Sequence, residues 1–387
     1  MKHYLLQLFV FFMIFELNAQ NITEIDLTKA KFGEIPANII FEEIEYVPLE
    51  THRDGLLNMR STFYLTDKYI ISVRFLSGAY LFDRETGAFI REISSFGQGP
   101  DEYKGYINPR YGFDEKNNVL FATEWAGSET VFKRINIETN KVDTPAIKVS
   151  KKHTDEFVLT SPWRINDDMY ISFCNNKTGK DKVRLVAFKK DGEIINKYPN
   201  YLEYINVDDS LSSSNSGIFY DYNGSTYFKE WGYNDTVFRV DEKKMLPHII
   251  FKLGDKQASY SHQKNSESLK GKYFMYFVHE SDSFVLFNFS YFTDDVKRST
   301  HTGYYDKKSK QVFISSTPDY EKSGYSVNGL PISFYPIYVS KNNEMVAIID
   351  PEELIKNKDK MDSKYRHLFK DIQEDDNPIL IIAKLKD

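Results

Sequence analysis

Residues 69–92, YIISVRFLSGAYLFDRETGAFIRE, decide the fold class of this chain. Three short runs rich in Ile, Val, Tyr and Phe are separated by a gap and by the polar turn DRETGA (83–88). Such runs, bounded by turn residues, are typical of antiparallel strands. The same composition recurs throughout the chain after residue 40, and no 12-residue stretch before residue 350 shows helical periodicity. The sequence therefore predicts an all-β protein.

This pattern occurs six times along the chain. The strand after each polar turn begins near Tyr69, Val119, Tyr170, Thr226, Phe284 and Met345, at intervals of 50, 51, 56, 58 and 61 residues. Units of this size fit the four-stranded blades of a β-propeller, whose closed ring hides the edges that an open sheet would expose. We predict a six-bladed β-propeller with four antiparallel strands per blade, in which the N-terminal segment 38–50 joins 377–387 to close the last blade. A β-sandwich is the structural alternative.

The first 19 residues have the pattern of a secretory signal peptide. Lys2 and His3 precede an apolar run from Leu5 to Phe15, and Ala19 stands where a signal peptidase would cleave. The run is too short to span a membrane, which takes about 20 residues. We therefore expect residues 20–387 to form one exported propeller domain without a transmembrane segment, either periplasmic or at the cell surface or secreted.

The chain contains one cysteine, Cys174. An intramolecular disulfide is thereby excluded, and no lipobox cysteine follows the signal to accept a lipid. Cys174 lies at the end of an expected strand with no histidine nearby in sequence, so we interpret it as a small packed side chain and not as a nucleophile.

Three motifs resemble a known family. They are VPLET (47–51), GQGPDEY (97–103) and NDTVFRV (234–240), the last followed by LP at 246–247. Over about residues 22–387 the chain resembles the six-bladed, NHL-like β-propeller proteins that Gram-negative bacteria export and that have long been catalogued as domains of unknown function. The resemblance implies a propeller fold and export, and it implies nothing about catalysis. Many members resemble lipoproteins, from which this chain departs because it lacks the lipobox cysteine.

The connections between the expected strands differ in length on the two sides of the ring. Turns between the third and fourth strands are tight, whereas connections from the second to the third strand and from blade to blade are long. Loops held on one side of a rigid scaffold usually carry binding sites. We place a ligand-binding funnel there, formed by arginines near the start of inner strands and by residues of the second-to-third connections: Arg60, Arg110 and Arg164, and Arg74, Trp125 and Trp231.

These residue types suit a particular ligand chemistry. An arginine guanidinium binds carboxylates or sulfates through two hydrogen bonds, and a tryptophan offers a flat apolar face to a sugar ring. The alternative is that the arginines form ion pairs between blades and the tryptophans pack there. The charged insertion 350–377 is expected to be helical, with Leu354, Met361, Tyr365 and Leu368 on one stripe, and it is either a lid or a cover over the last blade.

Catalytic and metal-binding motifs are missing from the sequence. It contains no HExxH, G-x-S-x-G, P-loop or calcium-loop spacing, so we predict neither a metal nor a cofactor. The ligand-rich segment HESD (279–282) is interpreted as a solvated turn. Glu124 and Glu230 each precede a tryptophan at equivalent places, which leaves a glycosidase-like carboxylate pair open.

The overall charge narrows the partners. With a net charge of −6, nucleic-acid binding is disfavoured. The leading interpretation is a monomeric, exported, non-enzymatic binding or scaffold protein that presents its funnel to an oligosaccharide, a peptide or a protein partner. The alternative is a propeller-type hydrolase, lactonase or lyase acting on a carbohydrate at the same funnel. A third interpretation is a purely structural partner in an outer-membrane complex.

Overall fold

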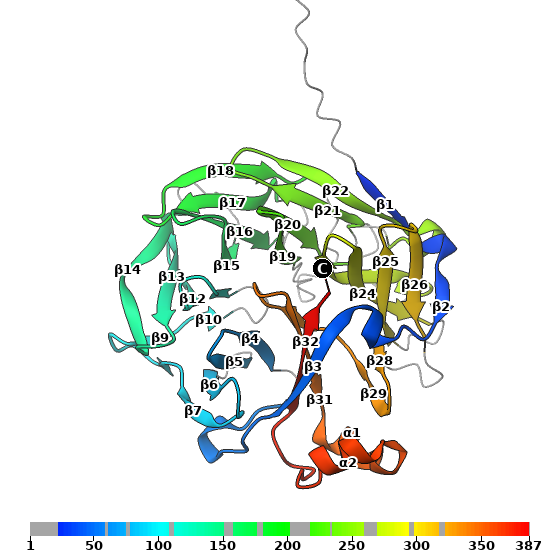
Figure 1. Ribbon diagram of the computed structural model, residues 1–387. Coiled ribbons are helices and arrows are strands. Elements are labelled where there is room, and N and C mark those ends of the chain that lie inside the picture. The colour runs from blue at the N-terminus through cyan, green and yellow to red at the C-terminus, as the bar shows by residue number, and fades with distance from the viewer. Residues whose placement is uncertain are drawn as a thin grey trace, which may run out of the picture.

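The computed structural model describes residues 22–58, 61–74, 78–107, 112–150, 158–175, 181–201, 217–232, 234–258, 269–293, 298–316 and 322–386. Six sheets, each antiparallel in its central strands, are arranged in a ring (Figure 1). The arrangement confirms the predicted six-bladed β-propeller. The blades are numbered here in chain order, and their strands run from the centre outward.

The first three blades are built from consecutive segments. Blade 1 comprises β4 (Thr62–Leu65), β5 (Tyr69–Arg74), β6 (Gly78–Asp83) and β7 (Phe89–Glu92). Blade 2 has a divided inner strand, β10 (Tyr106–Ile107) and β11 (Phe113–Asp114), followed by β12 (Val119–Ala126), β13 (Glu129–Asn136) and β14 (Lys141–Ser150). Blade 3 comprises β15 (Val158–Arg164), β16 (Met169–Asn175), β17 (Val183–Lys189) and β18 (Ile194–Pro199). A short pair, β8 (Ser95–Phe96) and β9 (Glu102–Tyr103), lies between blades 1 and 2 in sequence.

The remaining blades also recruit the N-terminal segment. Blade 4 comprises β19 (Gly217–Tyr222), β20 (Ser225–Glu230), β21 (Thr236–Val240), β22 (Met245–Lys252) and, parallel to β22, β1 (Thr23–Asp26). Blade 5 comprises β23 (Tyr273–Glu280), β24 (Phe284–Phe292), β25 (Arg298–Asp306), β26 (Gln311–Ser315) and the parallel β2 (Lys31–Gly33), with β27 (Lys322–Ser323) beside β25. Blade 6 comprises β30 (Tyr338–Val339), β31 (Glu344–Ile349), β32 (Ile379–Leu385) and β3 (Phe41–Pro48), and the hairpin of β28 (Tyr325–Val327) and β29 (Leu330–Phe334) precedes it.

The blades are held together by side chains on both faces of each sheet. The middle strands are buried almost throughout, because each face packs against a neighbouring blade; in β5, the four residues from Ile70 to Val73 are all buried. Aromatic rings meet across these interfaces. Phe132 of blade 2 stacks on Phe188 of blade 3 with ring centroids 5.4 Å apart, and Phe173 of blade 3 stacks on Phe228 of blade 4 at 5.5 Å. Pairs of this kind add to the free energy of burying the rings.

The ring is closed by joining the two ends of the chain in blade 6. β3 pairs antiparallel with β32, from Phe41 opposite Leu385 to Pro48 opposite Ile379. In Figure 1 the blue β3 and the red β32 lie side by side. The predicted closure by the N-terminal strand is therefore confirmed.

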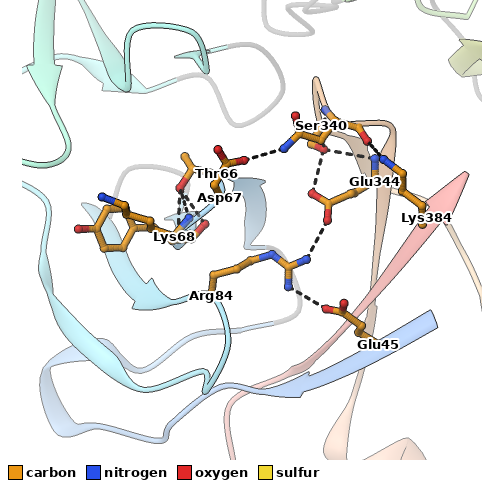
Figure 2. A network of polar contacts seen from close by, with 10 residues as sticks. Glu45, Thr66, Asp67, Lys68, Arg84, Ser340, Glu344 and Lys384 are labelled. Carbon is orange, nitrogen blue, oxygen red and sulfur yellow. Dashed lines mark hydrogen bonds and ion pairs between the residues drawn. The ribbon is translucent and has the colours of Figure 1, made fainter. Parts of the chain in front are cut away.

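An ionic contact ties blade 1 to this closing blade (Figure 2). Arg84, in the turn after β6, donates from Nη1 to Glu45 Oε2 of β3 at 3.1 Å and from Nη2 to Glu344 Oε1 of β31 at 2.9 Å. The Arg84 side chain is only 14% exposed. Nearby, Asn342 donates to Asp67 of blade 1 at 2.7 Å. Blade 1 is thus attached both to the first and to the last segments of the propeller.

The insertion 350–377 forms two short helices instead of a single one. α1 (Pro351–Lys356) begins after Asp350, whose side chain accepts a hydrogen bond from the Glu352 amide, and α2 (Ser363–Leu368) follows a 3₁₀ turn. Leu354, Met361 and Tyr365 are buried as expected, whereas Leu368 is exposed and Phe369 takes its place in the core. The two helices lie on the rim of the ring beside blade 6 (Figure 1), so the insertion covers the last blade.

Candidate ligand-binding channel

A cavity of about 1070 Å³ occupies the centre of the ring. Its lining includes residues from the inner strands of all six blades: Thr62, Phe113, Trp163, Ile218, Tyr276 and Tyr338. Pockets that bind small ligands usually measure about 300–1,000 Å³ and combine an apolar lining with a few polar groups. Below, the end formed by turns between first and second strands is called the turn end, and the end formed by second-to-third-strand connections is called the loop end.

Charged side chains pair with one another at the turn end. Arg164, the last residue of β15, donates from Nε to Asp114 Oδ1 at 3.1 Å, and its Nη1 lies 3.4 Å from Asp167. Lys116 contacts the same Asp167 at 2.6 Å. Arg164 does line the channel, but its expected position near the start of the inner strand, on the loop side, is wrong. The turn at 165–168 follows it directly and places it at the opposite end.

Two further contacts link different blades at the turn end. The backbone amide of Lys341 in blade 6 donates to Glu115 Oε2 of blade 2 at 2.6 Å, and Trp163 Nε1 donates to Asp221 of blade 4 at 3.4 Å. Burial raises the pKa of Glu115 to about 8, although the bond from Lys341 opposes the shift, and burial likewise raises the pKa of Asp221. The turn end is thus a polar rim in which one carboxyl group retains its proton near neutral pH.

Aromatic residues and one arginine form the loop end. Trp231, directly after β20, lies with its ring centroid 5.9 Å from that of Tyr276, and the Tyr276 hydroxyl is hydrogen-bonded to that of Tyr335. The guanidinium carbon of Arg298 lies 5.8 Å from the centre of the Tyr276 ring, and its Nε donates to Ser290 Oγ at 2.6 Å. This group, the loop-end cluster, combines flat ring faces with a positive charge.

Two buried side chains bring polar atoms to the channel wall, Asn288 on the side of blade 5 that faces blade 6, and Tyr338 at the turn end, where its ring packs on Tyr64 of blade 1. Asn288 of β24 and Tyr338 of β30 are 1% and 8% exposed, respectively, and both line the cavity. Asn288 Nδ2 donates to the Pro336 carbonyl at 2.9 Å. The Asn288 Oδ1 atom and the Tyr338 hydroxyl have no hydrogen-bond partner in the described part of the chain. Buried polar atoms are normally hydrogen-bonded, so each such atom in a cavity wall is a place for a ligand group.

Two of the other predicted residues, Arg74 and Trp125, lie away from this cavity. Arg74, at the end of β5, donates from Nη1 to the Leu56 carbonyl at 2.9 Å. Trp125 is 48% exposed, stacks on Tyr106 and donates from Nε1 to the Leu159 carbonyl at 3.2 Å. Arg60 and Arg110 lie outside the described residues, as does the signal segment 1–19. Of the six predicted residues, the channel brings together Arg164 and Trp231, at opposite ends.

The two glutamates considered as a carboxylate pair have structural partners instead. Glu230 is buried and forms an ion pair with the buried Arg184 of blade 3. Glu124 lies 3.2 Å from Lys133 Nζ and accepts a hydrogen bond from the Lys104 amide. Neither glutamate lines the channel.

The segment HESD (279–282) is not the solvated turn that its composition indicated. His279 and Glu280 end β23 and are both buried, because the inner strand continues to Glu280 before it turns. Burial lowers the pKa of His279, which lines the channel, to about 4. Burial alone raises the pKa of Glu280, but hydrogen bonds from His248 at 2.7 Å and Lys307 at 2.6 Å outweigh it and leave the pKa below its usual value.

Within the described ranges, no three His, Cys, Asp or Glu side chains are grouped so that they would hold a metal ion. None of the described helices has the length and apolar character needed to cross a membrane. Cys174 is buried, in agreement with its interpretation as a packed side chain, and burial raises the pKa of its thiol.

The comparison with known families identifies the chain. Residues 22–384 match a family described as "Domain of unknown function (DUF4934)". The chain belongs to the DUF4934 family. This DUF4934 chain is similar to a crystal structure from Bacteroides fragilis NCTC 9343 of a protein named as a predicted exported protein, with a TM-score of 0.66 and 17% identity over 94% of this chain and 100% of that one. At this identity the similarity shows the fold alone.

Two further solved structures are much less similar to the DUF4934 chain. The WD40 β-propeller domain of Doa1 gives a TM-score of 0.37 with 10% identity, over 87% of this chain and 97% of that one. The computationally designed Ika4 protein gives 0.24 with 11% identity, over 48% of this chain and 96% of that one. No curated protein matches the chain in sequence. The expected membership of a β-propeller family of unknown function is thus confirmed, whereas export and the NHL-like description stay predictions.

Proposed function

We propose that this DUF4934 protein is an exported, non-enzymatic binding protein that holds an oligosaccharide in its central channel. The observation that carries the proposal is that one cavity of about 1070 Å³ has a tryptophan at each end, Trp163 and Trp231, with further aromatic residues between them. Aromatic rings offer flat apolar faces with polar edges, which suit the two faces of a sugar ring. Two stacking positions along one channel favour a chain of sugars over a single one.

The remaining predicted residues have a secondary place in this proposal. Arg164 supplies charge at the turn end, where Asp114 and Asp167 fix its orientation. Arg60, Arg74, Arg110 and Trp125 are proposed to contact only those parts of a longer glycan that extend beyond the channel on the loop side, so that a short oligosaccharide bound within the channel does not reach them. A peptide or protein partner at that side is the other form of the same proposal.

A second candidate function has one specific observation in its favour. Glu115, with its raised pKa, lies beside Asp114, which is paired with Arg164, and both line the channel. A glycoside hydrolase uses two carboxyl groups that flank the scissile bond, and the one that acts as general acid has a raised pKa. In that case Glu115 would act as the general acid, and Glu115→Gln would abolish cleavage while leaving binding intact. In a protein that only binds, the wild type releases no reducing ends from any oligosaccharide.

Export is supported by the name of the B. fragilis neighbour and by the signal-like N-terminus. We propose cleavage after Ala19, release of a protein that begins at Gln20, and a monomer in the periplasm or outside the cell. Mass spectrometry of the exported protein tests this directly. An intact Met1 or an attached lipid would contradict it.

Calorimetric titration with a panel of short neutral and acidic oligosaccharides, which do not extend beyond the channel, tests the binding function. Trp231→Ala should weaken the binding of every oligosaccharide that binds, by about tenfold, which corresponds to about 1.4 kcal/mol. Trp125→Ala is the matched control, because it removes the same side chain outside the channel. Absence of binding across the panel, or an equal loss in both variants, would overturn the proposed channel site.

A further inference from the structure

The described carboxylates that line the channel lie at one end of it. Among the described lining residues, the carboxylates belong to the turn end: Asp114, Glu115 and Asp221. At the loop end stands Arg298, which begins β25 and is exposed to the cavity. No carboxylate of the described chain lies within ion-pair distance of its guanidinium, since its described contacts are the Ser290 hydroxyl and the Tyr276 ring.

The geometry of Arg298 leaves its binding edge available. Because Nε is occupied by Ser290 and one face of the guanidinium lies over Tyr276, the side chain is held in place while its two terminal nitrogens have no partner in the described structure. A guanidinium held in this way is arranged for bidentate binding of a carboxylate, at little cost in side-chain entropy. On a protein of net charge −6, this positive position also distinguishes the loop end from its surroundings.

The wall beside this cluster provides a complementary neutral group. Asn288 Oδ1 is an acceptor, and it is buried without a partner among the described residues. Unsatisfied buried atoms cost free energy in the empty protein, and a hydroxyl-bearing ligand removes that cost when it binds. Blade 5 thus provides one group that binds a carboxylate and one that binds a hydroxyl, since Arg298 and Asn288 both belong to it.

We infer that the loop end of the channel is a subsite for an acidic sugar, a ring that carries a carboxylate as well as hydroxyl groups. Arg298 binds the carboxylate, Asn288 Oδ1 binds a ring hydroxyl, and Trp231 stacks on the ring face. This inference rests on the proposed function, because it names the class of glycan that the channel selects.

Trigalacturonate and its fully methyl-esterified form are the probes that test the inference. The two ligands share their rings and hydroxyl groups, and only the first carries carboxylates. We expect the wild type to bind trigalacturonate at least about tenfold more tightly than the ester. Arg298→Gln should remove this preference while leaving the affinity for the ester within about twofold. Asn288→Ala should weaken both ligands by a similar factor, because the hydroxyl contact does not depend on the charge.

Controls separate a binding defect from a folding defect. Tyr46→Phe removes a hydroxyl on the outer strand β3, where Tyr46 contacts Tyr365 outside the channel, and it should change neither affinity. Thermal unfolding of all variants is measured in parallel, and Arg298→Lys provides a conservative second variant that keeps the charge but loses the bidentate geometry.

The outcomes distinguish the two levels of the proposal. If the wild type binds acid and ester equally and Trp231→Ala weakens both, the channel site stands and the acidic-sugar inference is overturned. If Arg298→Gln keeps the full preference for the acid, the carboxylate lies elsewhere and the inference is likewise overturned. If neither probe nor any other oligosaccharide binds, the proposed function and the inference fail together.

Discussion

Replacement of Arg84 by alanine tests how the ring is closed. Arg84 bridges blade 1 to both β3 and β31 of the closing blade, through Glu45 and Glu344 (Figure 2). Its contact with Glu344 is mostly buried and is worth about 1.5–3 kcal/mol, the range for hydrogen bonds to charged groups. The contact with the half-exposed Glu45 adds about 0–1 kcal/mol. We therefore expect Arg84→Ala to lower the free energy of unfolding by about 2–3 kcal/mol.

The assay is equilibrium unfolding in urea together with thermal unfolding. With an unfolding entropy of about 2.1 cal/mol/K per residue and roughly 360 folded residues, a loss of this size lowers Tm by about 3–4 °C. Lys189→Ala is the matched control: Lys189 ends the third strand of blade 3 and pairs with Glu193 of its own blade in an exposed contact. It should change the free energy of unfolding by less than about 0.5 kcal/mol.

A double-mutant cycle decides whether the bridge itself is responsible. Arg84→Ala and Glu344→Gln should show a coupling free energy of about 1 kcal/mol or more, since both remove the same contact. A coupling near zero, or a loss in Arg84→Ala no larger than in Lys189→Ala, would refute the reasoning that this bridge helps to close the ring.

Three further predictions concern the same architecture. Deletion of residues 22–50 removes β1, β2 and β3, the outer strands of three blades, and should abolish cooperative thermal unfolding; an unchanged transition would contradict the closure. The pKa of His279 is about 4 in the folded protein against 6.5 ordinarily, so the unfolded chain takes up the proton first as the pH falls from 6.5 to 4. About 3 kcal/mol of unfolding free energy is therefore lost between pH 6.5 and 4. In urea titrations at each pH, His279→Gln should lose less of it than His367→Gln, the control at an exposed site. Tyr365→Ala in α2 should cost about 2–4 kcal/mol of unfolding free energy and leave oligosaccharide affinity unchanged, whereas a loss of affinity at constant stability would make the insertion a lid.

The architecture was predictable because it rests on local patterns. Repeated aromatic and β-branched runs define the blades, and two hydrophobic runs at 38–50 and 377–387 needed partners, which they find in each other. The parallel strands β1 and β2 were not foreseen. Each has only three or four residues, TEID and KFG, and gives no alternating signal; their pairing depends on which blade edges lie within reach of the N-terminal segment.

The candidate site was predictable only in part, because its residues converge through the geometry of the ring. Arg164 stands six residues before Tyr170, closer than the nine of the first two repeats, and this shorter spacing already indicated a position next to the turn. Trp163 shares that strand. It was not predicted, because only arginines were expected on the inner strands and tryptophans only in the loops. Along β23, Phe274, Tyr276 and Phe277 all line the channel, and this aromatic run was a usable signal once the strand was known to be an inner one.

Other parts of the site have no local signature. The pairing of Glu230 with Arg184 joins residues 46 positions apart on different blades, so a sequence pattern within one blade gives no sign of it. The same holds for Tyr276 and Tyr335, 59 positions apart, whose hydroxyls meet at the channel only because blade 5 lies beside the segment that leads into blade 6. In each case the decisive contact forms outside a single blade.

Tryptophan fluorescence tests the channel site most directly, because the protein has three tryptophans and only two of them line the cavity. A short oligosaccharide that binds within the channel should change the emission of the wild type and protect it from quenching by acrylamide. The account predicts that Trp125→Phe keeps this response in full, and that the double variant Trp163→Phe, Trp231→Phe loses it although it unfolds at a similar temperature. A response that survives in the double variant and disappears in Trp125→Phe would place the ligand outside the channel and contradict the account.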